Sequence, residues 1–279
     1  MLPACGTQPY APRPWLGFIR TTTTSFSYAP FRDGRRVHVY VPPGYTHGTA
    51  RYPVLYMHDG QFLMGPSSRW NLDEMCQWLI DRRDVPPLIV VAIDNGGGRR
   101  TLEYTPFEDL AYPPGTTGGG ELYLRAIRDT LKPEIDRRFR TLPDAAHTYM
   151  AGFSLGGLLS VYAGYTYSAT WSRVLALSPT YDWDGHRMIA YAGGRTVWPN
   201  ARFYQDMGTI EAGGVTDVNH NGVDDYLEDL RAMAAVARRQ GFTSTSFRSV
   251  EASGDIHRAV DWAKRLPNAL RFVLRDPAP

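Results

Sequence analysis

Cysteine and lysine are scarce in this chain of 279 residues, and long hydrophobic runs are lacking. The two cysteines, Cys5 and Cys76, are too few for a disulfide framework. Lysine occurs only at Lys132 and Lys264, so arginine supplies nearly all of the basic side chains. No apolar segment approaches the roughly 20 residues that a membrane-spanning helix needs. These absences argue against a disulfide-stapled scaffold and against a transmembrane protein.

Charge of one sign is also lacking, because the formal net charge at pH 7 is only +2. The sequence has no basic stripe, so a nucleic acid is not an expected partner. The hydrophobic content of 43% supplies enough side chains for a large core. The length lies near the upper limit for one such core. We therefore expect a flexible, proline-rich lead-in over residues 1–20 and a single domain over residues 21–279.

The two cysteines suggest different roles. Cys76 lies at helical spacing with Leu72, Met75 and Leu79, which predicts a small core residue. The segment 2–6 around Cys5 resembles the end of a bacterial lipoprotein signal, although the charged and apolar regions of a signal are missing upstream. The alternative is an accidental match. The first interpretation predicts an extracytoplasmic protein, secreted, periplasmic or lipid-anchored, and the second leaves a cytoplasmic one open.

Short apolar runs alternate with amphipathic segments along most of the chain. Strands are expected at 21–28, 36–41, 52–57, 88–93, 147–152, 173–177, 202–207 and 246–250, and helices at 72–80, 121–139, 155–165, 224–239 and 258–274. In the helix at 121–139 we expect inward side chains at Leu122, Leu124, Ile127, Leu131 and Ile135, and a kink near Pro133. This alternation predicts an α/β fold with a mostly parallel central sheet and helices on both faces.

The segment Gly152-Phe153-Ser154-Leu155-Gly156 joins an expected strand to an expected helix. The pattern G-x-S-x-G in this context is typical of a nucleophile elbow, a sharp turn that exposes a serine hydroxyl beside a base. The two glycines allow the strand and the helix to pass close together. The pentapeptide alone would be weak evidence in a chain rich in glycine and serine. The strand–turn–helix context makes Ser154 the candidate nucleophile.

A base and an acid should follow other strands, because reactive side chains gather at the carboxyl ends of parallel strands. His257 follows the strand at 246–250, where it would take the serine proton; the alternative is a surface histidine at a helix start. Glu211 lies just past the strand at 202–207 and is the preferred acid. The rival carboxylates are Asp206, Asp182 and Asp184.

An oxyanion needs two backbone N–H groups. Leu155 follows the nucleophile directly, and Gln61 lies in the glycine-bearing loop after the strand at 52–57, which otherwise would be an ordinary turn. Trp70 and Trp183 are candidates for an aromatic substrate pocket, and core packing is the alternative for both.

Several motifs, taken in order, resemble the putative-esterase family, which includes enterochelin-esterase-like hydrolases and feruloyl and acetyl-xylan esterases. They cover residues 39–45, 52–61, 103–107, 152–157 and 208–211, and the segment from His257 to Trp262. The resemblance implies an α/β-hydrolase fold and hydrolysis of carboxylic esters without a catalytic cofactor. It also implies Ser154 as nucleophile, His257 as base, Glu211 as acid, and Gln61 and Leu155 as the oxyanion hole. The expected substrate is a small-molecule or polysaccharide-linked ester of the feruloyl, acetyl or siderophore type.

The segment 212–228 departs from that family pattern, because it matches a calcium-binding loop of about 12 residues. Its expected ligands are Asp217, Asn219, Asn221, the carbonyl of Val223, Asp225 and Glu228, with Gly222 at the sharp turn. A helix is expected to leave the loop but none to enter it. The alternative is an acidic solvated loop that ends in a helix cap. A structural Ca²⁺ would stiffen the segment after Glu211 and would suit an extracytoplasmic location.

Other function classes remain open on the sequence alone. A Ser-His-Glu set does not fix the leaving group, so a peptidase or an acyltransferase on the same scaffold is one alternative. A non-catalytic, calcium-dependent binding module is the other, and an intact candidate triad argues against it.

Overall fold

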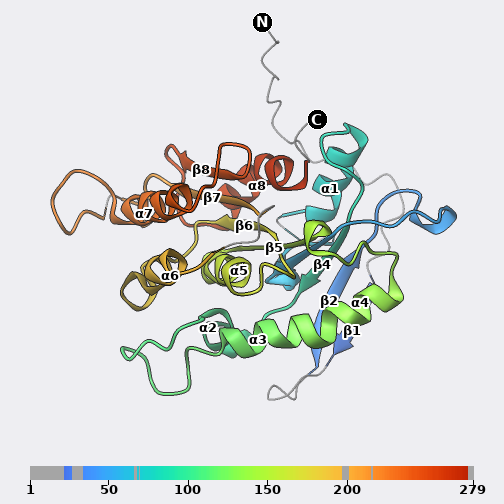
Figure 1. Ribbon diagram of the computed structural model, residues 1–279, viewed down its shortest axis with the longest axis horizontal. Helices are drawn as coiled ribbons and strands as arrows, with labels where there is room; N and C mark the ends of the chain where they lie inside the picture. Colours follow the sequence, from blue (N-terminus) through green and yellow to red (C-terminus); the bar gives the residue numbers. More distant parts are fainter. Residues whose placement is uncertain are drawn as a thin grey trace, which may run out of the picture.

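The computed structural model describes residues 22–26, 34–65, 68, 70–196, 201–214 and 216–275. The expected lead-in at 1–20, with Cys5, lies outside these ranges. One eight-stranded sheet, in the order β1-β2-β4-β3-β5-β6-β7-β8, runs through the centre of the described chain (Figure 1). Its strands are β1 Thr22–Phe26, β2 Arg35–Tyr40, β3 Val54–His58, β4 Ile89–Ile93, β5 Thr148–Phe153, β6 Arg173–Leu177, β7 Arg202–Gly208 and β8 Phe247–Ala252.

The sheet is mostly parallel, as the apolar runs predict. β4, β3, β5, β6, β7 and β8 pair in parallel, whereas β1 and β2 are antiparallel to their neighbours at one edge. The carboxyl ends of the six parallel strands therefore share one edge of the sheet, and the loops that follow them share it too.

Helices cover both faces of the sheet. α1 Leu72–Asp81 and α8 Ala259–Leu274 pack on one face, where Leu55 and Met57 of β3 point. The other face, where Val54 and Tyr56 point, is covered by α3 Gly120–Ala126, α4 Lys132–Arg138, α5 Leu155–Thr166, α6 Trp183–Gly193 and α7 Asp225–Arg239. Alternate residues of each buried strand thus pack into two separate cores. For this reason the strand sequences are continuously apolar rather than alternating.

The helix expected at 121–139 is divided in the structure. A π-helical turn at Ile127–Leu131 separates α3 from α4, directly before Pro133. Proline has no N–H and crowds the carbonyl four residues earlier, so the wider turn accommodates it. The expected inward position of Leu122 is wrong, because its side chain is 45% exposed. Leu122 and Leu124 are two positions apart, which places them on different sides of a helix, and Leu124 is the buried one.

Two helices were not expected from the sequence. α2 Arg100–Tyr104 is only five residues long, and α6 contains three consecutive left-handed residues, Asp184, Gly185 and His186. Such interruptions remove the helical period that sequence reasoning relies on. Short 3-10 turns lie at Tyr45–His47, Gly60–Phe62, Gly97–Arg99 and Ala145–His147. Across the described ranges, no helix combines the length and apolarity that crossing a membrane requires.

Candidate active site

The turn between β5 and α5 holds Ser154 in a strained backbone conformation. Its φ of 57° and ψ of −129° lie outside the regions that ordinary residues favour. A Cβ at Gly152 would overlap the carbonyl group of Gly156, so the chain can turn this sharply only with glycine there. The Ser154 N–H donates to the carbonyl of Leu177 on β6 at 3.0 Å, which anchors the turn to the neighbouring strand. The hydroxyl is thereby left at the carboxyl edge of the sheet.

His257 lies between Ser154 and Glu211. Its Nε2 is 2.9 Å from Ser154 Oγ, and its Nδ1 is 2.6 Å from Glu211 Oε2. Its backbone N–H donates to the Glu211 carbonyl at 3.0 Å, so the two loops are also joined through the main chain. The ring of Trp262 packs perpendicular to the imidazole, with a centroid distance of 4.8 Å. Three residues separated by up to 103 positions thus form one hydrogen-bonded chain.

Glu211 is a buried carboxylate, 4% exposed, at the end of β7. Burial raises its pKa, but hydrogen bonds from His257, from the Ser178 hydroxyl and from the Gly208 N–H outweigh burial, and the net pKa is lowered. Glu211 therefore stays ionised at neutral pH.

The rival carboxylates have other partners or positions. Asp206 is fully buried and lies 3.1 Å from Arg265, and Asp184 pairs with Arg187 at 2.9 Å. Asp182 is exposed at the start of α6. Glu211 is the carboxylate that reaches the His257 Nδ1.

The candidate oxyanion donors lie at the start of α5 and in the short 3-10 turn that follows β3. Leu155 is the first residue of α5, where backbone N–H groups have no partner within the helix. Gln61 lies in the 3-10 turn Gly60–Phe62, which begins two residues after the last residue of β3. A Cβ on Gly60 would come within 2.6 Å of the Ala92 main chain on β4, so this position needs glycine to bring the turn against the sheet.

The residue before that turn is fixed by a network that the sequence did not indicate. Asp59 has a φ of 63° and is fully buried. Its carboxylate accepts hydrogen bonds from Arg100 Nε at 2.7 Å, from Arg100 Nη2 at 3.0 Å and from Asn95 Nδ2 at 2.6 Å. The Asn95 N–H donates to the Gln61 side chain at 3.0 Å. Residues from the segment after β4 therefore hold the turn Gly60–Phe62, which carries the candidate oxyanion donor, in place.

His58, the last residue of β3, supports the same turn from inside the protein. It is fully buried, and its Nδ1 lies 3.3 Å from the Tyr123 hydroxyl. Burial, assisted by the charge of the nearby Arg100, lowers its pKa to about 3. The imidazole is therefore neutral at physiological pH and serves packing rather than proton transfer.

The two candidate pocket tryptophans lie in different surroundings. Trp70 is 2% exposed and stacks on Phe153 at 4.9 Å, behind the nucleophile. Trp183 is 8% exposed; its Nε1 donates to the Phe107 carbonyl at 3.0 Å, and its ring lies 5.0 Å from the half-exposed Tyr112. Both rings pack mainly against protein, and neither shows a large open face.

The expected calcium loop folds back on itself. The Asp217 carboxylate accepts from the N–H groups of Asn221 and Gly222, at 2.9 and 2.8 Å. Gly222 turns the chain at a φ of 84°. Glu228 accepts from the side-chain amides of Asn219 and Asn221, and Asp225 accepts from the Val218 N–H at 3.1 Å. Among the residues that the structure describes, no group of three or more His, Cys, Asp and Glu side chains is arranged to hold a metal.

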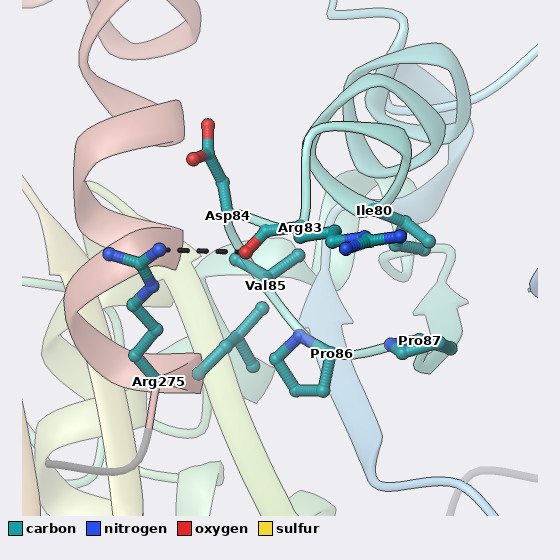
Figure 2. Close-up of a pocket in the computed structure, with 8 residues that line it drawn as sticks. Ile80, Arg83, Asp84, Val85, Pro86, Pro87 and Arg275 are labelled. Carbon is teal, nitrogen blue, oxygen red and sulfur yellow. Dashed lines mark hydrogen bonds between the residues drawn. The ribbon is translucent and has the colours of Figure 1, made fainter. Parts of the chain in front are cut away.

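A cavity of about 460 Å³ lies far from this chemistry (Figure 2). Figure 2 shows Asp84, Val85, Pro86 and Pro87 around it, with Arg275 bonded to the Arg83 carbonyl. Most of its lining residues come just before β4 in the chain, and the others are at the end of α8. The cavity therefore lies at the amino edge of the sheet, whereas Ser154 lies at the carboxyl edge. Its lining contains no candidate nucleophile or base, and we assign it no catalytic role.

The comparisons with known proteins agree with the geometry. A family model described as "Putative esterase" matches residues 30–273. The chain belongs to this esterase family. It is therefore an ester hydrolase, and esterases of this kind need no catalytic cofactor.

The chain is similar to relatives and solved structures whose names give several substrates. It is 25% identical to the ferri-bacillibactin esterase BesA of Bacillus subtilis over 268 residues, covering 88% of each chain. Its fold is similar to that of the siderophore hydrolase EstB from Aspergillus nidulans, with a TM-score of 0.73, 18% identity, and coverage of 96% of this chain and 99% of that one. The ferulic acid esterase AmCE1/Fae1A from Anaeromyces mucronatus gives a TM-score of 0.70 at 16% identity, with coverage of 97% and 96%. These last two likenesses confirm the α/β-hydrolase type of fold.

Proposed function

We propose that this esterase works through Ser154 as nucleophile, His257 as general base and Glu211 as the acid that supports the base. The observation that carries the proposal is the position of His257, within 2.9 Å of Ser154 Oγ and 2.6 Å of Glu211 Oε2. A serine hydroxyl is a weak nucleophile until a base removes its proton, and a histidine needs its second nitrogen fixed to be that base.

The reaction follows from this arrangement. Ser154 Oγ attacks the acyl carbon of the ester while His257 Nε2 takes its proton, and the charged Glu211 stabilises the imidazolium. The N–H groups of Leu155 and Gln61 stabilise the oxyanion. The tetrahedral intermediate then expels the alcohol, which takes the proton from His257. Water, activated by the same histidine, releases the acid from Ser154.

For the substrate, we propose esters of bulky aromatic acids, of the siderophore or feruloyl type. The names of the relatives support this choice. Exposed aromatic rings near the candidate site also support it: Phe62 follows Gln61 directly and is 52% exposed, and Tyr112, 45% exposed, packs on Trp183. A panel of p-nitrophenyl acetate, methyl ferulate and a cyclic tri-catecholate lactone would rank the substrate classes by kcat/KM.

We further propose that residues 21–279 act as one domain and that the loop at 217–228 binds a structural Ca²⁺. The carboxylates of Asp217 and Glu228 and the carbonyl of Val223 would hold the ion, with the side chains of Asn219, Asn221 and Asp225 completing an all-oxygen set. The loop begins a few residues after Glu211, so a bound ion would stiffen the segment that carries the acid. Calcium at millimolar levels is an extracytoplasmic condition, and the proposal places the enzyme there.

The triad is tested by replacing its members and measuring hydrolysis of p-nitrophenyl acetate together with labelling by a fluorophosphonate. Ser154→Ala should abolish labelling and lower kcat by roughly 10⁴-fold or more. Glu211→Gln should lower kcat by roughly 10² to 10⁴-fold, because it removes the charge opposite the imidazolium. Ser160→Ala is the matched control, since Ser160 lies in the same helix and donates only to the Gly156 carbonyl. Labelling of the Ser154→Ala variant at the parent rate would contradict the proposal.

A further inference from the structure

A buried polar cluster lies behind Glu211, on the opposite side from His257. Its centre is Ser178, the residue directly after β6, which is 1% exposed. Its Oγ is 2.7 Å from Glu211 Oε1, 2.9 Å from Trp262 Nε1 and 2.8 Å from Arg265 Nη2. Two of these partners belong to α8, so one hydroxyl joins the ends of β6 and β7 to the helix that follows the catalytic histidine.

The hydrogen-bonding capacity of these groups fixes the direction of every bond. An indole N–H and a guanidinium can only donate, whereas a hydroxyl has one proton and two acceptor positions. Trp262 and Arg265 therefore occupy both acceptor positions of Ser178. The single proton of Ser178 must point to Glu211, and a carboxyl that accepts there, as well as from His257 and Gly208, is ionised.

Arg265 is itself held in place by two carboxylates. Its guanidinium lies 3.1 Å from Asp206 and 3.2 Å from Asp255, and Lys264 adds a second cation 2.6 Å from Asp255. Burial raises the pKa of Asp206 to about 6, in opposition to Arg265, which lowers it. The Arg265 guanidinium is thus held in place by these carboxylates. The Ser178 hydroxyl accepts a hydrogen bond from this guanidinium and donates one to Glu211.

The backbone of Ser178 has a positive φ, which is costly for serine. Its φ is 40°, a conformation in which glycine is relaxed and serine is not. Its N–H donates to the Asp206 carbonyl at 2.9 Å, a bond that glycine would make equally well. The feature that serine adds at this position is the hydroxyl.

We propose that Ser178 is a positioning residue for ester hydrolysis. Its hydroxyl holds the Glu211 carboxylate toward His257 and takes up part of the carboxylate's negative charge, and so sets the pH range in which His257 acts as a base. The inference rests on the proposed triad, since it acts through Glu211 and His257.

Several other groups face this pair and enter any pH dependence. Tyr226 of α7 interacts electrostatically with Glu211, and Asp182 at the start of α6 interacts electrostatically with His257. Arg265 and Asp206 act from behind Ser178, and the Gly208 N–H donates to Glu211 from β7. A substitution at Ser178 removes none of these groups, so they affect the pH dependence of activity in the parent protein and in the variants alike.

The test compares Ser178→Ala with Ser178→Gly over pH 5 to 9, a range of about four units around the ordinary histidine pKa. Both variants lack the hydroxyl, but only glycine relaxes the backbone. We expect kcat to fall roughly ten- to hundredfold in both, because Glu211 is no longer aligned. We also expect the acidic limb of the kcat/KM profile to move to higher pH by roughly 0.5 to 1 unit, because an unshared negative charge favours protonated His257.

The control is Ser172→Ala, which removes another fully buried hydroxyl, one that donates to the Ala145 carbonyl away from the triad. It should alter stability but not the pH profile. An unchanged pH profile in both Ser178 variants, with Ser154→Ala inactive, would overturn the inference and leave the triad intact. A slow Ser178→Ala beside a normal Ser178→Gly would overturn it too, by tracing the effect to the backbone. An active Ser154→Ala would instead reject the triad itself.

Discussion

Two serines at the carboxyl edge of the sheet share an unusual backbone. Ser154 has a φ of 57° and Ser178 a φ of 40°, and each directs its hydroxyl into the hydrogen-bonded chain that runs through His257 and Glu211. Conformations of this kind cost about 1 to 3 kcal/mol each and persist only where the surroundings hold them. Here the neighbouring strands do so, because the Ser154 N–H donates to Leu177 and the Ser178 N–H donates to Asp206.

The buried His58 should also make the folding stability of the protein sensitive to acid. The folded-state pKa of His58 is about 3, below the ordinary value of 6.5, because the ring is buried and faces Arg100. Between about pH 6.5 and pH 3 the unfolded chain binds a proton at His58 that the folded chain excludes. Stability from this residue is therefore complete above about pH 6.5 and is lost as the pH falls.

The difference between the folded and unfolded pKa values of His58 sets the size of this change in stability. Between pH 7.5 and pH 5.5, His58 should lower the free energy of unfolding by about 1.4 kcal/mol. His58→Gln should lose this part of the acid sensitivity, and urea unfolding at the two pH values measures the difference. His147→Gln, which changes a more exposed histidine beside Asp144, is the control. An equal acid sensitivity in the parent and in His58→Gln would show that the buried ring is not the source.

At the scale of elements, the loops after the parallel strands differ in how they are held. The loop after β4 is tied to the turn after β3 through Asn95, Arg100 and Asp59. The loop after β7 is tied at its start through Glu211 and at its end through Asp224, whose side chain accepts from Thr216 and caps α7 at Tyr226. Most of the loop at 217–228 lies between those ties, and its residues from 217 to 222 are largely exposed.

That loop is where a calcium ion should change stability. If free calcium is about 100 times the dissociation constant, the proposed site should stabilise the protein by about 2.7 kcal/mol. Asp217→Ala should abolish the response, because it removes one of the charged ligands, whereas Glu134→Ala on α4 removes an equal charge elsewhere and should keep it. Melting curves of metal-free protein with chelator and with millimolar calcium give the measurement. Identical curves for the parent protein would reject the site.

At the scale of the whole molecule, α8 connects the active site to the core. It packs against β6 and β7, and its first turns supply Trp262 and Arg265 to the site. At its other end, two buried arginines from those strands bind its carbonyl groups: Arg173 donates to Val273 and Arg202 to Phe272, both at 3.0 Å. Cations at a helix C-terminus also complement its dipole. The helix is therefore held at both ends.

A core substitution in α8 should accordingly act on stability rather than on chemistry. Leu270 is fully buried, and Leu270→Ala should lower the free energy of unfolding by about 2 to 5 kcal/mol. Val260→Ala, at a position that is 61% exposed on the same helix, should change it by no more than about 0.5 kcal/mol. Urea unfolding provides both values. A loss below about 1 kcal/mol at Leu270 would mean that the face of the sheet under α8 repacks easily.

Features that depend on neighbours along the chain could be predicted from the sequence. The strand and helix pattern follows from the period of apolar residues, and the turn at Ser154 follows from the glycines beside it, so most elements and the candidate nucleophile could be predicted. The exceptions were elements with an interrupted period, namely α6 with its left-handed residues and the π-helical turn before Pro133. The positions of His257 and Glu211 after expected strands, together with the order of motifs, made them the expected base and acid.

Which carboxylate reaches His257, and which groups lie behind that carboxylate, depends on contacts between segments far apart in the chain. Asp206 lies within β7, Glu211 follows β7 and Asp182 follows β6, and their distances to His257 depend on how these strands and the loop before α8 are placed in space. Ser178 also comes directly after a strand, but a single serine outside any recognisable motif gives no signal in the sequence. Its hydrogen bonds join residues 33 to 87 positions apart, and contacts of that separation leave no period in the sequence.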